Sequence, residues 1–287
     1  MKNCDRVLVV TPLKDEIDNL PKLVEAMKLQ AERVYCWVVV ENGSTDGSRE
    51  YLESLLDVGI SEIPHFFVIN FTLPDESYAL GVKYATVVNY GFEYAKNLSL
   101  YNEIDYIGIC DADCFPCEYY YRELTEYMRS NSIDISSGYG RFLNGKHDGE
   151  AAGWVRGNCR LWSKSVFEQS GYIVGPSADA LSLAKAISKG FIARPLSSLT
   201  YECREMGSRS RYDYYGYSSY YRGETFLHSI LKSIKLLAVG EISNSILFLR
   251  GYWGAFWARK PRLEDEELRE YFRGAILRRV KEFLNVA

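Results

Sequence analysis

Short apolar runs alternate with helical patterns in the first half of this chain, and this alternation limits what the chain can fold into. The runs are rich in β-branched and aromatic residues and read as buried strands, over residues 6–12, 33–42, 65–71 and 104–110. Helical patterns with one apolar side follow the first three runs, over residues 17–27, 43–56 and 81–98. Strands that alternate with helices predict an α/β fold, with a mostly parallel central sheet and helices on both faces.

The second half of the chain continues this pattern less regularly. The expected elements are helices over residues 118–130 and 178–190, a strand near 133–142, and a strand with a short helix over 158–172. Residues 191–196 are predicted to form the last strand. Residues 201–222 are rich in Arg, Tyr, Gly and Ser, a composition that predicts a flexible loop.

Composition sets the size of the core and the sign of the charge. The chain has 287 residues, 47% of them hydrophobic, which is enough for one large domain or one domain with an appendage. The net charge of −4 argues against a nucleic-acid binder. Residues 204–260 nevertheless carry nine basic and four acidic residues, whereas residues 1–203 carry a net charge of −9. A local basic segment suggests contact with an anion or an acidic membrane surface.

The cysteines and the N-terminus indicate the compartment. Of the seven cysteines only Cys114 and Cys117 are closely spaced, and no second pair completes a zinc site. Scattered thiols are typical of buried residues in a reducing compartment. The apolar run near the N-terminus is too short for a signal peptide, so we expect a cytoplasmic protein.

The tail, residues 223–287, has a strong amphipathic pattern. Its apolar stripe at helical spacing consists of Phe226, Leu227, Ile230, Leu231, Ile234 and Leu237, opposite Ser229, Lys232, Ser233 and Lys235. An aromatic segment with a basic end follows over residues 242–260, and charges interrupt every apolar run of ~20 residues. Two interpretations stay open: a helix in a membrane interface, peripheral on the cytoplasmic face, or a helical pair packed on its own domain or a second subunit.

Asp111 and Asp113 follow the fourth predicted strand directly. Carboxylates at positions i and i+2 of an extended segment point the same way and can share one hard cation, such as Mg²⁺ or Mn²⁺. Such a cation suits a diphosphate leaving group, because it offsets the charge that builds up as the bond breaks. Residues 11–16 and 41–47 also follow strands, so in a parallel sheet all three loops lie on one rim.

Two other enzyme classes fit these motifs less well. A phosphatase-like hydrolase places its Asp-x-Asp after the first strand, followed by Thr or Val, whereas Asp113 follows the fourth strand and precedes Cys114. A dinucleotide-dependent oxidoreductase requires a G-x-G-x-x-G after the first strand, and the sequence has none there.

Five segments resemble, in order, the motifs of inverting glycosyltransferases of family 2, which have the GT-A fold of nucleotide-diphospho-sugar transferases. They are VVTPLKDE (9–16), VVVENGSTDGS (38–48), GVKYATVVNYGFEYA (81–95), ICDADC (109–114) and ADALSLAKAISKG (178–190). The similarity runs over residues 5–225. The departures are Asp15 in place of Asn, Glu41 and Asn42 in place of two aspartates, and Ala178 in place of Glu.

This resemblance implies a domain organisation and an activity. A GT-A catalytic domain would span residues 1–222, with a nucleotide-binding half (1–115) and an acceptor half (116–222), before a C-terminal helical extension (223–287). The activity would be metal-dependent inverting transfer, with Mn²⁺ or Mg²⁺, from a nucleotide-diphosphate sugar to a glycan or lipid-linked acceptor. The alternative is a catalytically impaired member that binds nucleotide sugar or serves as a scaffold subunit, because of the departures above.

The resemblance also implies roles for individual residues. Asp179 would be the general base, Asp113 the main metal ligand, and Asp111 a ligand of the metal or the ribose. The donor-binding residues would be Thr11 and Pro12 in the base pocket, Glu41 as acceptor for a base N–H, and Glu16. Independently of the resemblance, Arg204, Arg209 and Arg211 lie in a Gly-, Ser- and Tyr-rich segment that could close over a diphosphate, or could be a solvated charged loop.

Purely structural roles are the alternatives for two of these residues. Glu41 could be a solvated strand-end residue, and Asp179 could be only a helix N-cap. The third metal ligand stays open between His228, Glu202, and oxygens of water and diphosphate.

Overall fold

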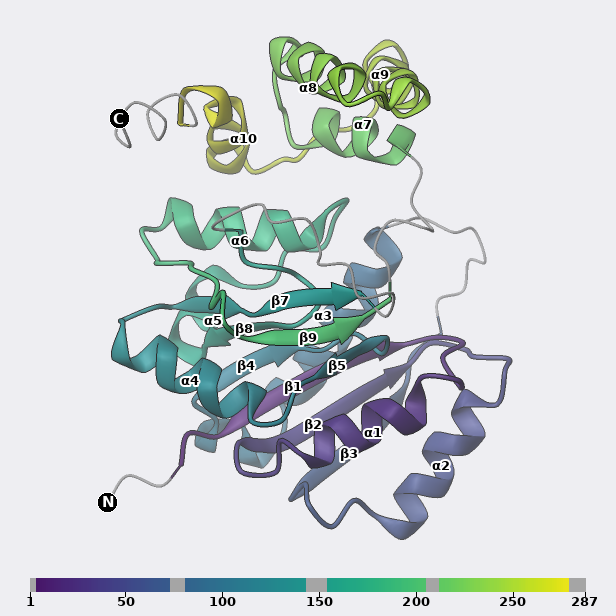
Figure 1. Ribbon diagram of the computed structural model, residues 1–287, viewed down its shortest axis with the longest axis vertical. Helices are drawn as coiled ribbons and strands as arrows, with labels where there is room; N and C mark the ends of the chain where they lie inside the picture. The colour runs from purple at the N-terminus through teal and green to yellow at the C-terminus, as the bar shows by residue number, and fades with distance from the viewer. Residues whose placement is uncertain (1–3, 73–80, 143–153, 205–211, 279–287) are drawn as a thin grey trace. The chain divides into compact units, whose positions relative to one another are not determined.

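The computed structural model describes residues 4–72, 81–142, 154–204 and 212–278 (Figure 1). The chain divides into two compact units, residues 1–206 and 207–287. The second unit therefore begins before the predicted domain boundary at residue 222, and that boundary stays a prediction.

The main sheet of the first unit has the strand order β3-β2-β1-β4-β8-β6. Its strands are β1 (Val7–Leu13), β2 (Val34–Glu41), β3 (His65–Asn70), β4 (Tyr106–Ile109), β6 (Ile135–Ser137) and β8 (Arg160–Ser163). Strands β1 to β4 are parallel, and β8 runs antiparallel to both β4 and β6. The predicted mostly parallel central sheet is confirmed.

The register brings the predicted loops to one rim. Leu13 is paired with Glu41 at the end of β1 and β2, and Val10 is paired with Ile109 at the end of β4. Because these strands are parallel, the loops that follow them leave from the same edge of the sheet.

Helices cover both faces of this sheet, because alternate side chains of each strand enter different cores. Val7 and Val9 pack with α1 (Leu20–Lys28), α2 (Ser48–Val58) and α4 (Tyr120–Ser130), whereas Leu8 and Val10 pack with α3 (Val82–Lys96), α5 (Lys164–Ser170) and α6 (Ala178–Ser188). A short 3₁₀ helix, η1 (Ser99–Glu103), precedes β4. The prediction that helices cover both faces of the sheet is therefore confirmed.

A smaller sheet contains the strands that the sequence places least well. Its order is β5-β9-β7, from β5 (Cys114–Pro116), β9 (Thr200–Cys203) and β7 (Tyr139–Phe142). The expected single strand near 133–142 is divided between β6 and β7, on either side of Gly138. A side chain at Gly138 would place its Cβ 2.6 Å from the carbonyl oxygen of Leu199, so only glycine fits this crossing.

Two further expectations about this region are wrong. Residues 191–196 form no strand, only a bridge between Ile135 and Ala193, since Pro195 lacks the N–H that a ladder needs. The last strand is β9, and residues 212–221 are helical, although 201–222 was predicted to be a loop. Composition misled here, because it hid the alternation of buried and exposed residues in β9.

The second unit consists of α7 (Tyr212–Tyr221), α8 (Phe226–Ala238), α9 (Ile242–Trp257) and α10 (Glu266–Arg273). Helices α7 and α9 meet backbone to backbone through two glycines. A Cβ at Gly216 would lie 2.0 Å from the Phe248 carbonyl oxygen, and one at Gly251 would lie 1.9 Å from that of Asp213. Within the described residues, no helix combines the length and apolarity needed to cross a bilayer.

Gly91 allows α3 to lie directly on the main sheet. A Cβ there would lie 2.5 Å from Val10 Cγ1 and 2.7 Å from Val40 Cγ2. We expect Gly91→Ala to lower the free energy of unfolding by about 1–3 kcal/mol, as overpacked cores do. Thr86→Ala on the same helix should change it by less than about 0.5 kcal/mol. Chemical denaturation measures both, and equal effects of the two variants would contradict this account.

Candidate functional site

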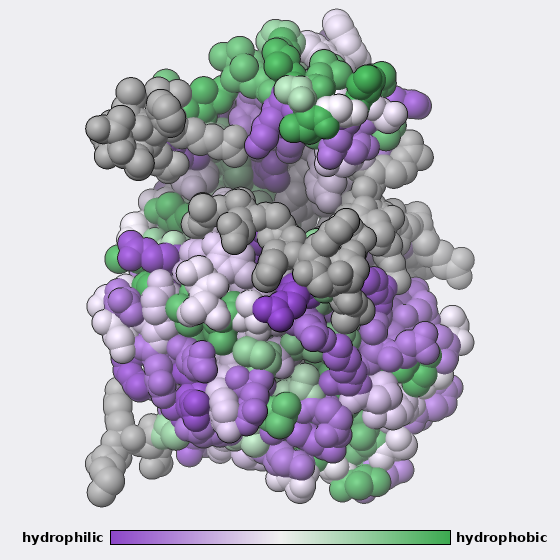
Figure 2. All heavy atoms as spheres, viewed as in Figure 1, coloured by the Kyte–Doolittle hydropathy of each residue, from purple (hydrophilic) through white to green (hydrophobic). Residues whose placement is uncertain are grey.

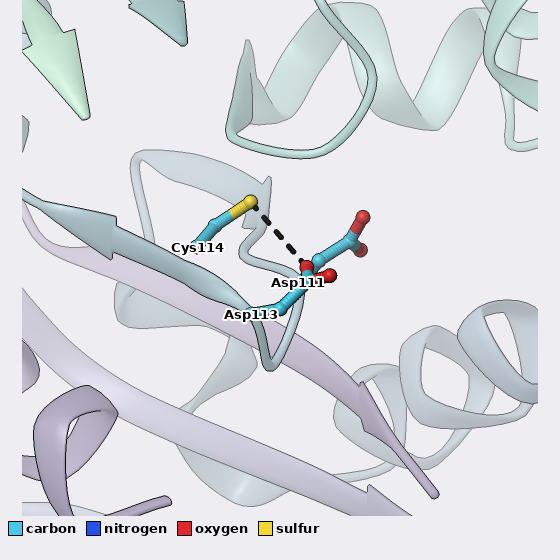
Figure 3. Close-up of side chains that lie close together, drawn as sticks. All are labelled: Asp111, Asp113 and Cys114. Atoms are coloured by element: carbon cyan, nitrogen blue, oxygen red, sulfur yellow. Dashed lines mark hydrogen bonds between the residues drawn. The ribbon is translucent and has the colours of Figure 1, made fainter. Parts of the chain in front are cut away.

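Asp111 and Asp113 lie in the turn that joins β4 to β5 (Figure 3). The turn is held by the Asp111 N–H, which donates to the Asn158 carbonyl, and by the Cys114 N–H, which donates to the Asp111 carbonyl, both at 2.9 Å. The two carboxylates and Cys114 Sγ each offer an atom within 4.8 Å of the others. The structure therefore keeps the predicted carboxylate pair together at the rim of the sheet.

Other carboxylates lie within electrostatic range of Asp111. Burial raises the pKa of Asp111 well above its usual value, and the charge of Asp113 raises it further; a hydrogen bond from Tyr84 lowers it, and Asp179 and Glu16 again raise it. Asp113, Asp179 and Glu16 therefore lie near enough for their charges to act on Asp111. Repulsion of this kind is relieved when a cation binds between carboxylates.

Tyr84 is a site residue that the motifs did not single out. Its hydroxyl donates to Asp111 Oδ1 at 2.5 Å from the first turn of α3. Burial and the charge of Asp111 hold the pKa of Tyr84 well above its usual value, so the phenol stays a donor. The only sequence signal was its place within the segment 81–95 that resembles the family helix.

The donor set fits a hard cation supplied by two residues of this chain. Carboxylate oxygens are the ligands that Mg²⁺ and Mn²⁺ prefer. Cys114 does not suit such an ion, because burial raises the pKa of its thiol well above the usual value and keeps it protonated. Its Sγ instead donates to Asp113 at 3.8 Å and accepts from the Asn158 amide at 3.2 Å. Asp111 and Asp113 are thus the residues that could hold a metal.

Arg204 ties the carboxylate cluster to the loop after β1. Its guanidinium bonds Glu16 Oε2 at 2.5 Å and lies 3.7 Å from Asp113 Oδ2, while its N–H donates to the Asp113 carbonyl. The side chain of Glu16 also accepts from Asn19. A cationic side chain is therefore in place beside Asp113, directly after β9. The predicted residues Arg209 and Arg211 lie outside the described residues.

The predicted base-binding residues lie at the ends of β1 and β2. Glu41 has 0% exposure, so the alternative of a solvated strand-end residue is wrong. Its carboxylate accepts from the Ser44 N–H at 2.5 Å and from the Arg49 guanidinium at 2.7 and 3.0 Å. Strand β1 lies between β2 and β4 in the sheet, and Glu41 lies three residues beyond the position of β2 that is level with the end of β4.

Thr11 and Pro12 are both buried in β1. The Thr11 hydroxyl accepts from the Trp37 indole N–H at 2.9 Å and faces the core under α1. A contact between this segment and a base would therefore fall to the main chain, and the predicted pocket role of both residues stays a prediction.

Asp179 lies in the first turn of α6, where it contacts two residues of the preceding segment, Gly157 and Arg160. The N-cap position belongs to Ser177, so the alternative that Asp179 is only an N-cap is wrong. A Cβ at Gly157 would lie 2.6 Å from Asp179 Cβ, which shows how closely the aspartate packs there. The guanidinium of the fully buried Arg160 donates to the Asp179 carbonyl at 2.7 Å.

Arg160 links the start of α6 to the residues before Gly157. Its Nε donates to the Arg156 carbonyl and a terminal nitrogen donates to the Val155 carbonyl, both at 2.8 Å. No pattern in the sequence points to Arg160 or Gly157, because their partners are carbonyl groups and a side chain that only the fold brings near.

The two side chains considered as third metal ligand, Glu202 and His228, are both engaged elsewhere. Glu202 pairs with Lys22 at 2.5 Å, and His228 lies 3.2 Å from Glu224 within the second unit. Both candidates therefore have ion-pair partners of their own, and oxygens of water and ligand are the simpler completion of the shell.

Comparison with known proteins identifies relatives of this architecture. A family model described as Glycosyl transferase family 2 matches residues 8–154. That range contains β1, β2, β3, β4 and the Asp111–Asp113 turn. No curated protein sequence matches the chain significantly.

Solved structures share the fold at low sequence identity. S. aureus TarS has a TM-score of 0.56 and 11% identity over 88% of this chain, which spans only 44% of that TarS chain. TarS 1–349 in complex with UDP-GlcNAc has a TM-score of 0.56 and 11% identity, covering 92% of this chain and 78% of that one. The mannosyltransferase PcManGT from Pyrobaculum calidifontis, in complex with GDP-Man and Mn²⁺, has a TM-score of 0.54 and 12% identity, covering 100% and 82%. The fold is therefore GT-A.

The buried Glu41–Arg49 pair predicts a pH-dependent contribution to stability. Burial alone raises the pKa of Glu41, but hydrogen bonds from Ser44 and Arg49 outweigh it, and the pKa lies below its usual 4.5. The stabilisation is therefore complete above pH 4.5 and is lost as the pH falls through the lower folded-state pKa. We expect Glu41→Gln to lower the free energy of unfolding by about 1–3 kcal/mol at neutral pH.

Denaturation of wild type and variant at neutral and strongly acidic pH measures this effect. The difference between them should shrink in acid, where the wild-type carboxyl is protonated. The exposed Glu53→Gln on α2 is the control and should change little at either pH. A Glu41→Gln effect that stays constant with pH would contradict the prediction.

Proposed function

Because the chain belongs to glycosyl transferase family 2, we propose that it moves a sugar from a nucleotide-diphosphate sugar to an acceptor hydroxyl, with inversion at the anomeric carbon and Mn²⁺ or Mg²⁺ as cofactor. The observation that carries the proposal is that Asp111 and Asp113 share one turn at the rim of the GT-A sheet. This turn is bonded to Asn158, and Asp179 packs against the neighbouring Gly157. One group of carboxylates can hold a cation with the diphosphate while another receives a proton.

On the donor side, Asp111 and Asp113 would hold the cation, with Tyr84 fixing the orientation of Asp111. Bound there, the ion would neutralise charge on the departing nucleoside diphosphate. Arg204 lies beside Asp113 and would turn from Glu16 toward a phosphate oxygen when the donor binds. Arg209 and Arg211 follow it in the chain and are proposed to add to the same anion site.

On the acceptor side, Asp179 would act as general base. Its carboxylate takes the proton of the acceptor hydroxyl while that oxygen forms a bond to the anomeric carbon. The bond from this carbon to the diphosphate oxygen breaks in the same step, and a single displacement inverts the configuration. This chemistry needs no second carboxylic acid, which distinguishes it from hydrolysis by paired carboxylates.

The donor base would be read at the ends of β1 and β2. Glu41 is an acceptor held in its ionised form by Arg49, which suits the ring N–H of uracil, thymine or guanine. The solved relatives are bound to UDP-GlcNAc and to GDP-Man, which differ in base and sugar. We propose that Thr11, Pro12 and Glu41 form a base pocket in this chain, and that this pocket binds a nucleotide whose base carries a ring N–H.

The acceptor is proposed to be a glycan or a lipid-linked glycan, in lipid-linked glycan, polysaccharide or glycoconjugate synthesis. The support is the basic, apolar segment after residue 225, which suits peripheral association with the cytoplasmic face of a membrane.

A donor screen tests the proposed reaction. UDP-, GDP- and dTDP-sugars are incubated with the protein and Mn²⁺ or Mg²⁺, and nucleotide release is measured. We expect release with one donor class, and its loss with chelator and in Asp113→Ala, because the diphosphate then lacks its counter-charge. Asp179→Asn should bind the donor normally but lose at least about 100-fold in turnover.

One control variant and two contrary outcomes decide how this screen is read. Glu202→Gln, outside the carboxylate pair, should leave the metal response unchanged. Normal turnover in Asp179→Asn would remove this residue as the base, and donor binding without any turnover in the wild type would favour the impaired-member alternative.

The close contact between Gly157 and Asp179 predicts a separate effect on turnover. A methyl group at position 157 must displace the Asp179 side chain, and a shift of about 1 Å in a catalytic group can cost ~100-fold in rate. We therefore expect Gly157→Ala to lower kcat by about that factor, with little change in donor KM.

Gly138→Ala is the matched control, because its Cβ would meet the Leu199 carbonyl at the same 2.6 Å, away from Asp179. It should lower thermal stability without a comparable loss of kcat in the folded enzyme. Equal losses of kcat in the two variants would show that Gly157 has only a structural role.

A further inference from the structure

Buried serines form part of the contact between helices α8 and α9. Ser229 and Ser233 of α8 are buried, as is Ser245 of α9. The hydroxyls of Ser233 and Ser245 are 2.5 Å apart, and Ser245 also donates to the Ser233 carbonyl at 3.2 Å. Hydroxyl groups therefore lie inside this helix pair, where an ordinary amphipathic helix places apolar side chains. The ring contact between Phe226 and Trp253 adds to the same helix contact.

The apolar stripe predicted for α8 faces outward. Its most exposed members retain about half of their accessible surface: Phe226 at 51%, Leu227 at 55%, Leu231 at 47%, Ile234 at 54% and Leu237 at 48%. Figure 2 shows hydrophobic residues gathered over the part of the molecule that Figure 1 labels α8 and α9. A soluble helix does not usually leave such a row in water.

Helix α9 repeats the arrangement. Ile242, Ile246 and Trp257 are 59%, 61% and 75% exposed and share one side of the helix by their spacing. On its inner side, Gly251 lies directly against α7. Small residues at the helix contacts and large apolar residues outside are the arrangement by which helices pack in lipid.

Basic residues border this outer face. Residues 226–262 contain Lys232, Lys235, Arg250, Arg259, Lys260 and Arg262, and Glu241 as the one acidic residue. Lys235 is one helical turn from Leu231, and Arg250 is one turn from Ile246, so both lie beside exposed apolar side chains. Each basic residue close to an anionic bilayer contributes about 1 kcal/mol of attraction.

We propose that the outer face, defined as Leu227, Leu231, Ile234, Ile242, Ile246 and Trp257, docks into the surface of an anionic phospholipid bilayer. The apolar side chains would enter the headgroup boundary, and Lys235 and Arg250 would meet lipid phosphates. A second copy of the chain is the less suitable occupant, because a two-fold interface would set the same basic residues against each other. This surface specifies the membrane association given under the proposed function. Its biological role rests on that function, whereas binding to the bilayer does not.

Flotation of the full-length protein with vesicles tests this surface. We expect the protein to float with vesicles of phosphatidylcholine and phosphatidylglycerol at low salt, and to float poorly with phosphatidylcholine alone or at high salt. Ile234→Glu combined with Trp257→Glu should lower the partition coefficient at least about tenfold. Lys235→Gln and Arg250→Gln should each lower it about fivefold.

Val58→Glu is the matched control, because Val58 is 86% exposed on α2 of the first unit. It should float as the wild type does. No flotation of the wild type at low salt, or unchanged flotation of the double variant, would overturn the proposal. So would a wild-type dimer in sedimentation that the double variant converts to a monomer, because the face would then be an interface between copies.

Nucleotide release without vesicles keeps this test separate from that of the proposed reaction. Release without flotation would overturn only the docking surface. Flotation without release would support the docking surface and leave the transferase proposal without its activity.

Discussion

Carboxylates crowded at the buried end of β4 are the constraint on which the first unit depends. Asp111 is half-buried beside Asp113, and the charges of Asp179 and Glu16 also act on it. The neighbouring groups answer this charge, with a phenol hydrogen bond from Tyr84 and a guanidinium from Arg204. Such an arrangement costs a protein stability unless a ligand uses it, which is why clusters of this kind mark functional sites.

Asp15 and Glu41, two of the departures from the family motifs, have partners in this fold. Asp15 accepts from the Thr45 N–H at 2.7 Å, and the Asp15 N–H donates to the Ser44 hydroxyl, so the loops after β1 and β2 are joined. Glu41 is one methylene longer than aspartate and reaches Arg49 on α2. Ala178 is 2% exposed at the start of α6, a place where a second carboxylate would be desolvated. These positions stiffen the rim around the Asp111–Asp113 turn.

The two units follow opposite packing rules. In the first, valines and leucines of the sheet meet apolar helix faces, and the hydrophobic effect stabilises the contact. In the second, glycines and serines join a small aromatic cluster at the helix contacts, while a row of long aliphatic side chains and Trp257 remain outside. The second unit thus leaves unused a hydrophobic free energy that an apolar environment could supply.

Local pattern alone determined the α/β class, the rim that gathers three loops, and the Asp111–Asp113 pair. Those features follow from periodicities of 2 and 3.6 residues and from residues adjacent in the chain, so no distant contact is needed to see them. Only the tertiary structure decided that Thr11 faces Trp37, that β9 rather than residues 191–196 is the last strand, and that the apolar stripe of α8 points outward. It also decided the roles of Tyr84, Gly157 and Arg160. Each of these depends on a partner from a separate segment, and a stripe or a lone polar residue carries no record of which distant surface it will meet.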